Sequence, residues 1–214
     1  MKPGESILAC FALKEEAAPF RKPATDLPKV EVLITGMGKR NAARSLRSFL
    51  EGRRPDHVLS CGFAGGLNPA LKTGTVVFAA DNDSGLETAL SNAGAQRVRF
   101  HCADSVAATA AEKQAVWKST GAEAVEMESQ ALGAVCDESG IPFSVVRVIL
   151  DTAAEDLPLD FNRLMTPDMR MDYARLAVAI VKSPGKIGAL LKLQKQGQAA
   201  AASLAKVLVT LLDR

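Results

Sequence analysis

Residues 124–130, Ala-Val-Glu-Met-Glu-Ser-Gln, place two carboxylates where an apolar strand turns into a helix. Alternation along a strand puts Glu126 and Glu128 on one face and Met127 on the other, unless the helix has already begun and rotates the three apart. Open α/β sheets bind ligands where a strand runs into a helix, so the two acids stand where chemistry is expected. A purely structural alternative is that both acids face the positive end of the helix dipole.

Two other apolar runs also end in acids. Residues 143–151, Phe-Ser-Val-Val-Arg-Val-Ile-Leu-Asp, end at Asp151, and residues 7–13, Ile-Leu-Ala-Cys-Phe-Ala-Leu, lead into Glu15 and Glu16. Ligand-binding residues of α/β sheets gather at the carboxyl ends of the strands. We therefore expect the three groups of carboxylates to form one site.

The composition is that of a globular protein. The chain has 214 residues, of which 48% are hydrophobic, so it can bury a substantial core. The formal net charge of +2 and the isoelectric point near 8.4 give no general argument for nucleic-acid binding. No stretch resembles a signal peptide or is long enough to cross a bilayer.

The four cysteines, Cys10, Cys61, Cys102 and Cys136, lack CxxC spacing, and three of them lie in strand-like apolar runs. This pattern predicts reduced core thiols rather than disulfides or a metal site. We therefore expect a cytoplasmic protein.

Strand and helix signals alternate along the chain, which predicts an α/β fold with a mixed or parallel sheet wrapped by helices. Pro19, Pro23 and Pro28 indicate an irregular connection after the first strand. Only helix is expected after residue 168, with a break at residues 183–185. We expect one main domain over residues 1–182 and a helical extension over residues 183–214.

Glycines are concentrated in two turns. Gly62, Gly65 and Gly66 suit a loop that cradles a sugar or a phosphate, because glycine allows close backbone approach and positive φ. A sharp turn would use them equally well. Residues 36–38, Gly-Met-Gly, are too short for a dinucleotide fingerprint or a P-loop.

Five segments occur in the order typical of one family: residues 12–16 (Ala-Leu-Lys-Glu-Glu), 36–43, 62–67 (Gly-Phe-Ala-Gly-Gly-Leu), 124–129 and 142–151. Together they resemble the nucleoside phosphorylase/nucleosidase superfamily, with a pattern similar to that of the methylthioadenosine/S-adenosylhomocysteine nucleosidases. The resemblance implies a single α/β domain with a central, partly closed mixed sheet. It also implies cleavage of an N-ribosidic bond without a metal or an organic cofactor.

The resemblance implies roles for individual residues. Asp151 matches the general acid that protonates a purine leaving group, and burial at a strand end can raise its pKa for that task. Glu128 matches the acid that binds the ribose hydroxyls, and Glu16 matches the base that activates water in the hydrolytic members. Met127 is expected to pack on the ribose, and Arg147 either to orient the acids or to form a plain ion pair.

Further substrate contacts are implied for Gly62, Phe63, Ala64, Gly65, Glu126, Asp104, Ser105 and Val106.

Three positions depart from the family pattern. Phe63 replaces a serine of the phosphorylases and of many nucleosidases, and Ser60 replaces a phosphate-binding arginine of the hexameric bacterial phosphorylases. Because the glycine-rich loop lacks an arginine and Phe63 is expected to occupy phosphate space, hydrolysis is predicted rather than phosphorolysis. Val106 replaces an aromatic residue that stacks on the base, which leaves the identity of the base open.

The segment between Asp81 and Val98 is much shorter than in the nucleosidases, so the site is expected to be open. This shortening and the helical C-terminus resemble the hopanoid-associated phosphorylase branch, which is thought to remove adenine from adenosylhopane, a ribosylated lipid. The resemblance implies an adenine nucleoside with a bulky or lipid 5′ substituent, and a homo-oligomer.

Lysines alternate with aliphatic residues in the C-terminal helices, among them Lys182, Lys186, Lys192, Lys195 and Lys206. Such a basic amphipathic stretch can lie on an anionic membrane surface. It can equally dock its apolar stripe on the domain or on another subunit.

Two classes of function are consistent with these residues: an enzyme, and a non-catalytic relative that binds a nucleoside. Phe63 and Val106 suggest the second class. Glu16, Glu128 and Asp151 together favour the enzyme, because binding alone needs neither a general acid nor a water-activating base.

Overall fold

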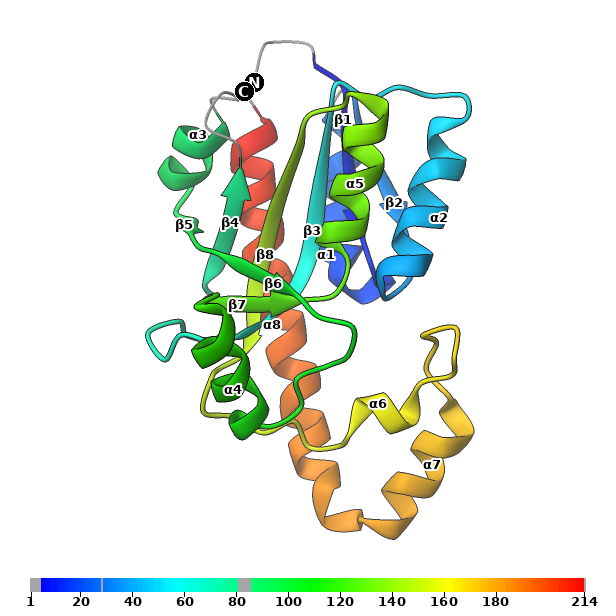
Figure 1. Cartoon of the computed structure of the whole chain (residues 1–214), viewed down its shortest axis with the longest axis vertical. Helices are drawn as coiled ribbons and strands as arrows, with labels where there is room; N and C mark the ends of the chain where they lie inside the picture. The colour runs from blue at the N-terminus through cyan, green and yellow to red at the C-terminus, as the bar shows by residue number, and fades with distance from the viewer. Residues whose placement is uncertain (1–4, 28, 81–85, 214) are drawn as a thin grey trace.

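The computed structural model describes residues 5–27, 29–80 and 86–213, and it contains a mixed β-sheet with helices on both faces (Figure 1). The elements in chain order are β1 (Ile7–Phe11), α1 (Lys14–Thr25), β2 (Val30–Ile34), α2 (Lys39–Leu50), β3 (His57–Gly66), β4 (Val76–Ala80), α3 (Leu86–Asn92), β5 (Gln96–Arg97), β6 (Phe100–Cys102), α4 (Ala110–Thr120), β7 (Ala124–Glu126), α5 (Ser129–Ser139), β8 (Phe143–Asp151), α6 (Phe161–Leu164), α7 (Tyr173–Lys182), η2 (Pro184–Lys186) and α8 (Ile187–Leu212).

The main path of the sheet has the strand order β2-β1-β3-β8-β4-β5. β1 is parallel to β2 and to β3, β3 is parallel to β8, and β4 runs antiparallel to β8. β7 leaves this path by pairing with the end of β3, and β6 pairs with β7, so these two short strands lie across the sheet (Figure 1). This architecture confirms the predicted α/β fold with a mixed sheet flanked by helices.

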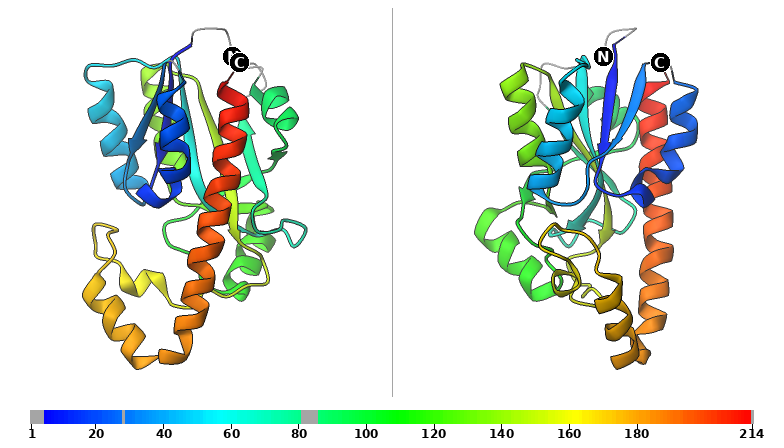
Figure 2. Two further views of the ribbon diagram at one scale, coloured as in Figure 1. Left: turned by 180° about the vertical axis from the view of Figure 1, so that it is seen from behind. Right: turned by 90° about the vertical axis from the view of Figure 1, so that its right-hand side faces the viewer.

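Each face of the sheet has its own apolar core (Figure 2). α1 and α8 pack together on one face, where Phe20 and Leu208 join side chains of β1, β3 and β8. α2 and α5 pack together on the other face, where Leu46 and Leu132 are buried. Because both faces are covered, the strand ends are the part of the sheet that stays accessible to a ligand.

α1 corrects the prediction of an irregular connection after the first strand. The helix contains Pro19 and Pro23, whereas Pro28 lies outside the described residues. Ala17, Phe20 and Ala24 are buried at helical spacing, and this packing outweighs the hydrogen bonds that the two prolines cannot make. The first turn of this helix holds Glu16, one of the predicted site acids.

α8 begins outside the sheet and ends within the core. Its residues from Ala200 to Leu211 include seven buried side chains, which pack with α1 and β8. Its first turns, α6 and α7 project beyond the sheet (Figures 1 and 2). The division predicted at residue 182 stays a prediction. Among the described helices, none combines the length and the apolar character needed to cross a membrane.

The cysteines are all unpaired. Cys10, Cys61 and Cys136 are buried and Cys102 is half-buried. Burial raises the pKa of the Cys61 thiol to about 12, so it is held as a neutral thiol in the core.

Candidate active site

A buried arginine stands at the centre of the predicted site. β8 places Arg147 between the sheet and the strand-to-helix junction of residues 126–128, and its side chain is 1% exposed. Its Nη2 atom lies 2.7 Å from Glu126 Oε2, 3.3 Å from Glu128 Oε2 and 2.9 Å from the hydroxyl of Ser60. Arg147 therefore forms ion pairs with both acids of the junction.

The two acids of the junction differ in their other contacts. Glu126 accepts the backbone N–H groups of Glu128 and Ser129 and the hydroxyl of Ser129, at 2.9, 2.8 and 2.6 Å. Glu126 thus caps the N-terminus of α5, which agrees with the alternative that the acids face the positive end of the helix dipole. It also pairs with Arg147. Glu128 accepts the N–H of Gly38, at 2.9 Å, from the turn before α2. Met127 between them is buried.

Glu16 joins the same cluster from α1. Its carboxylate accepts the backbone N–H groups of Leu13 and Phe63, at 2.9 and 2.8 Å. Gly62 separates it from Arg147, with a φ of +143° that favours glycine. A Cβ atom at Gly62 would lie 2.7 Å from Arg147 Nη1 and 2.8 Å from Glu16 Oε1, so only glycine fits between them.

Burial and Arg147 set the ionisation of these three acids. Burial raises the pKa of Glu16 to about 7, against the opposing effect of Arg147. Burial also raises the pKa of Glu128 above its usual range. Burial alone would raise the pKa of Glu126, but Arg147 and the hydrogen bonds from Ser129 hold that pKa below its usual range. The protonation of Glu16 therefore changes near neutral pH.

Glu16→Gln is expected to remove a pH dependence of stability. The pKa of Glu16 is about 7 in the folded protein and 4.5 ordinarily, so the folded state keeps a proton that the unfolded chain has released. Wild-type stability should therefore fall as pH rises from 4.5 to 7, by up to about 1.4 kcal/mol per pH unit. Urea unfolding across this range measures the effect. Glu15→Gln, at an exposed position in the same turn, is the control, and equal pH profiles for the two variants would contradict the assignment.

Asp151 lies at the end of β8 and pairs with a lysine that the sequence analysis did not identify. Lys113 of α4 is fully buried, and its Nζ forms an ion pair with Asp151 Oδ2. The same ammonium donates to the carbonyls of Thr152 and Glu155, at 2.9 and 2.6 Å, so all three of its hydrogens have acceptors. Burial raises the pKa of Asp151 above its usual range, and Lys113 opposes part of that shift.

Lys113→Met is expected to lower the free energy of unfolding by about 3–5 kcal/mol, because it leaves Asp151 buried without its cation. For the double variant Lys113→Met/Asp151→Asn, the decrease in the free energy of unfolding should be smaller than the sum of the decreases for the two single variants. Lys39→Met is the matched control, since Asp104, its partner in a 2.7 Å ion pair, is 89% exposed, and such a pair contributes about 1 kcal/mol or less. Equal losses for Lys113→Met and Lys39→Met would show that the buried pair is not structural.

Asp151 and Glu16 border the same short segment of β3. A Cβ atom at Gly65 would lie 3.7 Å from Asp151 Oδ2, just as one at Gly62 would contact the carboxylate of Glu16. Gly65 also pairs with Asp151 across the sheet, next to an irregularity after Ala64. Residues 62–65 therefore separate the Asp151–Lys113 pair from the Arg147 cluster and place both at one edge of the sheet.

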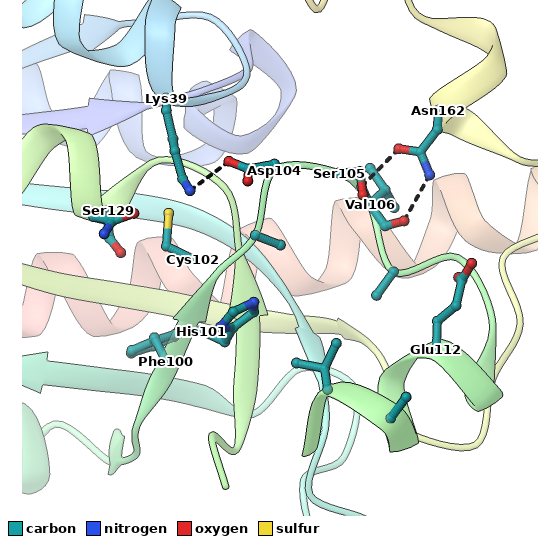
Figure 3. Close-up of a pocket in the computed structure, with 15 residues that line it drawn as sticks. Lys39, Phe100, His101, Cys102, Asp104, Ser105, Val106, Glu112, Ser129 and Asn162 are labelled. Carbon is teal, nitrogen blue, oxygen red and sulfur yellow. Dashed lines mark hydrogen bonds and ion pairs between the residues drawn. The ribbon is translucent and has the colours of Figure 1, made fainter. Parts of the chain in front are cut away.

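A cavity of about 930 Å³ lies beside this edge (Figure 3). Asp104, Ser105 and Val106 line it, as do Lys39 and Ser129. Glu16, Glu128 and Asp151 are not among its lining residues. Ser129 connects the two parts, because it lines the cavity and its hydroxyl donates to Glu126.

The loop of residues 104–106 is held from both ends. Lys39 pairs with Asp104, and the Asn162 side chain exchanges two 2.9 Å hydrogen bonds with the backbone of Val106 (Figure 3). Pairing with Lys39 lowers the pKa of Asp104 below its usual range. Asn162 therefore fixes the backbone of Val106, and Lys39 fixes Asp104, at the cavity.

Phe63 is positioned differently from what the sequence suggested. Its ring packs against the main core and lies near Gly197 of α8. Since side chains alternate along a strand, Phe63 faces α8 while Gly62 faces Arg147. Its backbone N–H reaches Glu16, but its ring does not compete with a ligand next to Arg147. The bulk of Phe63 therefore gives no argument about phosphate.

Lys113, Lys39 and Asn162 are site residues that the sequence did not predict. Lys113 is the one buried residue of α4, a helix whose apolar residues form no clear stripe, so periodicity gives no signal for it. Lys39 lies within the motif segment 36–43, which gives no signal for its pairing with Asp104. Among the described residues, no group of three or more His, Cys, Asp and Glu side chains is placed to hold a metal ion.

The fold and the site together define a class of protein: an α/β enzyme with buried acids gathered at one edge of a mixed sheet. The model of the family described as "Phosphorylase superfamily" matches residues 26–95 and 83–182. The chain therefore belongs to the phosphorylase superfamily, and it is an enzyme of this nucleosidase and phosphorylase class.

Similar proteins include both nucleosidases and a related hydrolase. The 5′-methylthioadenosine/S-adenosylhomocysteine nucleosidase of Geobacillus kaustophilus is 29% identical over an alignment of 183 residues, and the match covers 68% of this chain and 77% of that protein. The structure of such a nucleosidase from Colwellia psychrerythraea with adenine has a TM-score of 0.72 and 17% identity, covering 98% of this chain and 95% of that one. Helicobacter pylori futalosine hydrolase has a TM-score of 0.66 and 18% identity, covering 95% and 97%.

Proposed function

We propose that this protein hydrolyses the N-glycosidic bond of an adenine nucleoside. Membership of the superfamily supports cleavage of this kind of bond. Adenine as the base is supported by the relatives, because one is a methylthioadenosine/S-adenosylhomocysteine nucleosidase and one solved relative is a complex with adenine. The choice of water as nucleophile comes from the site itself.

The charge of the Arg147 cluster is the observation on which hydrolysis rests. Three buried carboxylates, Glu16, Glu126 and Glu128, surround one guanidinium. With Glu126 ionised and Glu16 ionised as its role of base requires, the cluster carries a net charge of −1, or −2 when Glu128 is ionised as well. Phosphate brings almost two further negative charges, which this cluster would repel in a medium that screens poorly. Water is neutral and needs only a base and a few hydrogen-bond partners.

Each acid has a distinct part in the proposed reaction. Glu16 takes a proton from water as the water oxygen bonds to the anomeric carbon. The bond from that carbon to the base nitrogen breaks, its electron pair leaves with the base, and Asp151 supplies the proton that neutralises the base. Glu128 accepts hydrogen bonds from the ribose hydroxyls and stabilises the positive charge that develops on the sugar. The products are the free base and the free sugar.

Arg147 supports this arrangement as a positioning residue. It holds Glu126 and Glu128 and lies across Gly62 from Glu16. Its Nε is buried and has no hydrogen-bond acceptor among the described residues. One buried donor of the cluster is therefore left for a bound water.

We further propose that the substrate carries a bulky or lipid 5′ substituent, adenosylhopane being one example. The cavity of about 930 Å³ is near the upper end of the range for ligand pockets. Asp104, Ser105 and Val106 form one wall of it and are proposed to contact the base. Part of the segment expected to be shortened, residues 81–85, lies outside the described residues.

Product analysis tests the proposal. Adenosine, 5′-methylthioadenosine and adenosines with 5′-alkylthio chains of increasing length are incubated with the protein, with and without phosphate. Hydrolysis predicts adenine and a free sugar at a rate independent of phosphate, and the proposed substituent predicts a kcat/KM that rises with chain length. A sugar 1-phosphate formed only with phosphate would establish phosphorolysis instead.

A cytoplasmic location and self-association stay predictions, which fractionation and analytical ultracentrifugation test.

A further inference from the structure

The uncovered apolar surface of the molecule lies on α7 and the first turns of α8. We call residues 173–195 the α7–α8 corner. α7 has no buried residue, although it is an amphipathic helix. All the exposed large hydrophobic side chains of the described residues lie on this corner: Tyr173 at 77%, Val178 at 52%, Val181 at 79%, Ile187 at 43% and Leu191 at 54%. A concentration of exposed apolar side chains in one place indicates an interaction surface.

The same corner is uniformly basic. Residues 173–212 contain no Asp or Glu, and their six basic residues are Arg175, Lys182, Lys186, Lys192, Lys195 and Lys206. Arg175 pairs with Asp172, and Lys192 lies 3.9 Å from Glu155. For Lys182, Lys186 and Lys195 the described residues provide no ion-pair partner. Free ammonium groups therefore lie beside the apolar side chains.

We propose that the α7–α8 corner is a docking surface for a lipid bilayer that contains anionic lipids. An amphipathic helix with lysines beside its apolar face is suited to the membrane interface, where aliphatic side chains enter the acyl boundary and ammonium groups meet the headgroups. The corner also projects beyond the sheet, so it reaches a flat surface before the rest of the domain does (Figure 2). Docking of this kind is peripheral and reversible.

The charge of the corner argues against a second copy of the chain as the occupant. A two-fold interface places the same patch of both subunits face to face. Here it would bring the unpaired Lys182, Lys186 and Lys195 of one copy close to those of the other, with no acid on the segment to compensate. An anionic lipid surface supplies the missing negative charge.

The corner is connected to the candidate site. The segment between α6 and α7 lies on the start of α2, where the Asn41 side chain donates to the carbonyl of Asp168 at 2.8 Å, and Met169 lies against Gly38 in the turn before that helix. Asn162, on α6, binds Val106 at the cavity. A bilayer bound at the corner would therefore lie next to the segment that borders the site, although docking itself does not depend on the proposed reaction.

Vesicle co-sedimentation of the full chain tests the proposal without any assay of activity. We expect binding to phosphatidylcholine vesicles that contain phosphatidylglycerol, and little binding to phosphatidylcholine alone. Each lysine near an anionic surface contributes about 1 kcal/mol, so Lys182→Gln/Lys186→Gln should weaken binding roughly 30-fold. Lys72→Gln/Lys118→Gln removes the same charge from exposed positions elsewhere and should weaken it much less.

A second pair of substitutions tests the apolar part of the surface. Val178→Ser/Val181→Ser should also weaken binding to anionic vesicles while leaving the melting temperature unchanged, because both side chains are already exposed. The proposal is overturned if the wild-type chain does not bind anionic vesicles, or if the two lysine pairs behave alike. It is also overturned if Val178→Ser/Val181→Ser converts an oligomer into monomers in analytical ultracentrifugation, since a second copy would then cover the corner.

Discussion

Asp151→Asn is expected to lower kcat for base release by about 10²- to 10⁴-fold, the usual contribution of a general acid. The amide has the same shape as the carboxyl group but has no acidic proton to give to the departing base. Its oxygen can still accept a hydrogen bond from Lys113, but the buried ammonium loses its counter-charge, so stability should fall and circular dichroism is used to verify that the assayed protein is folded. The effect is measured as the rate of adenine release at saturating substrate, with the 5′-substituted adenosine that has the highest kcat/KM.

The control for this substitution is Asp137→Asn, at an exposed position on α5, which should leave kcat unchanged. The pH profile separates a chemical from a structural role. Glu16 must be ionised to accept a proton, so kcat/KM of the wild type should rise with pH through about 7. Asp151→Asn should keep this rising limb at a reduced rate, whereas Glu16→Gln should abolish it. Wild-type turnover in Asp151→Asn would show that another group protonates the base.

Arg147→Met is expected to lower the free energy of unfolding by about 3–5 kcal/mol or more, the largest stability loss that we predict. The substitution leaves Glu16, Glu126 and Glu128 buried with no cation among them. Their pKa values should then rise, so the folded state binds protons that the unfolded chain has released. Stability should therefore be lowest at about pH 8 and recover towards about pH 5.

Urea unfolding at several pH values tests this expectation. The matched control is Arg53→Met, which breaks a 2.7 Å ion pair with Glu31 whose partners are both more than half exposed. That pair should contribute about 1 kcal/mol or less, with little dependence on pH. If Arg147→Met is no less stable than Arg53→Met, or if its stability is independent of pH, the carboxylates do not depend on Arg147 for their burial.

The strand-end pattern was sufficient to predict the class of fold and most of the acids. Apolar runs that end in Glu16, Glu128 and Asp151 indicate an α/β sheet because burial on both faces makes each strand apolar, and the acids follow where the strand reaches the edge. The family was also predictable, because the five motif segments occur along the chain in the order typical of that family, and the family model matches the chain. The course of α1 was not, because proline signals a break while the burial of Phe20 depends on α8.

The sequence by itself determined which residues end the strands, and with them the superfamily and the acids available for chemistry. Only the tertiary structure decided how those acids are paired. It places Lys113 of α4 against Asp151, three carboxylates around Arg147, and the ring of Phe63 on the α8 side of β3. The physical reason is that periodicity reports whether a side chain is buried, whereas pKa and charge balance depend on which distant side chain it meets there.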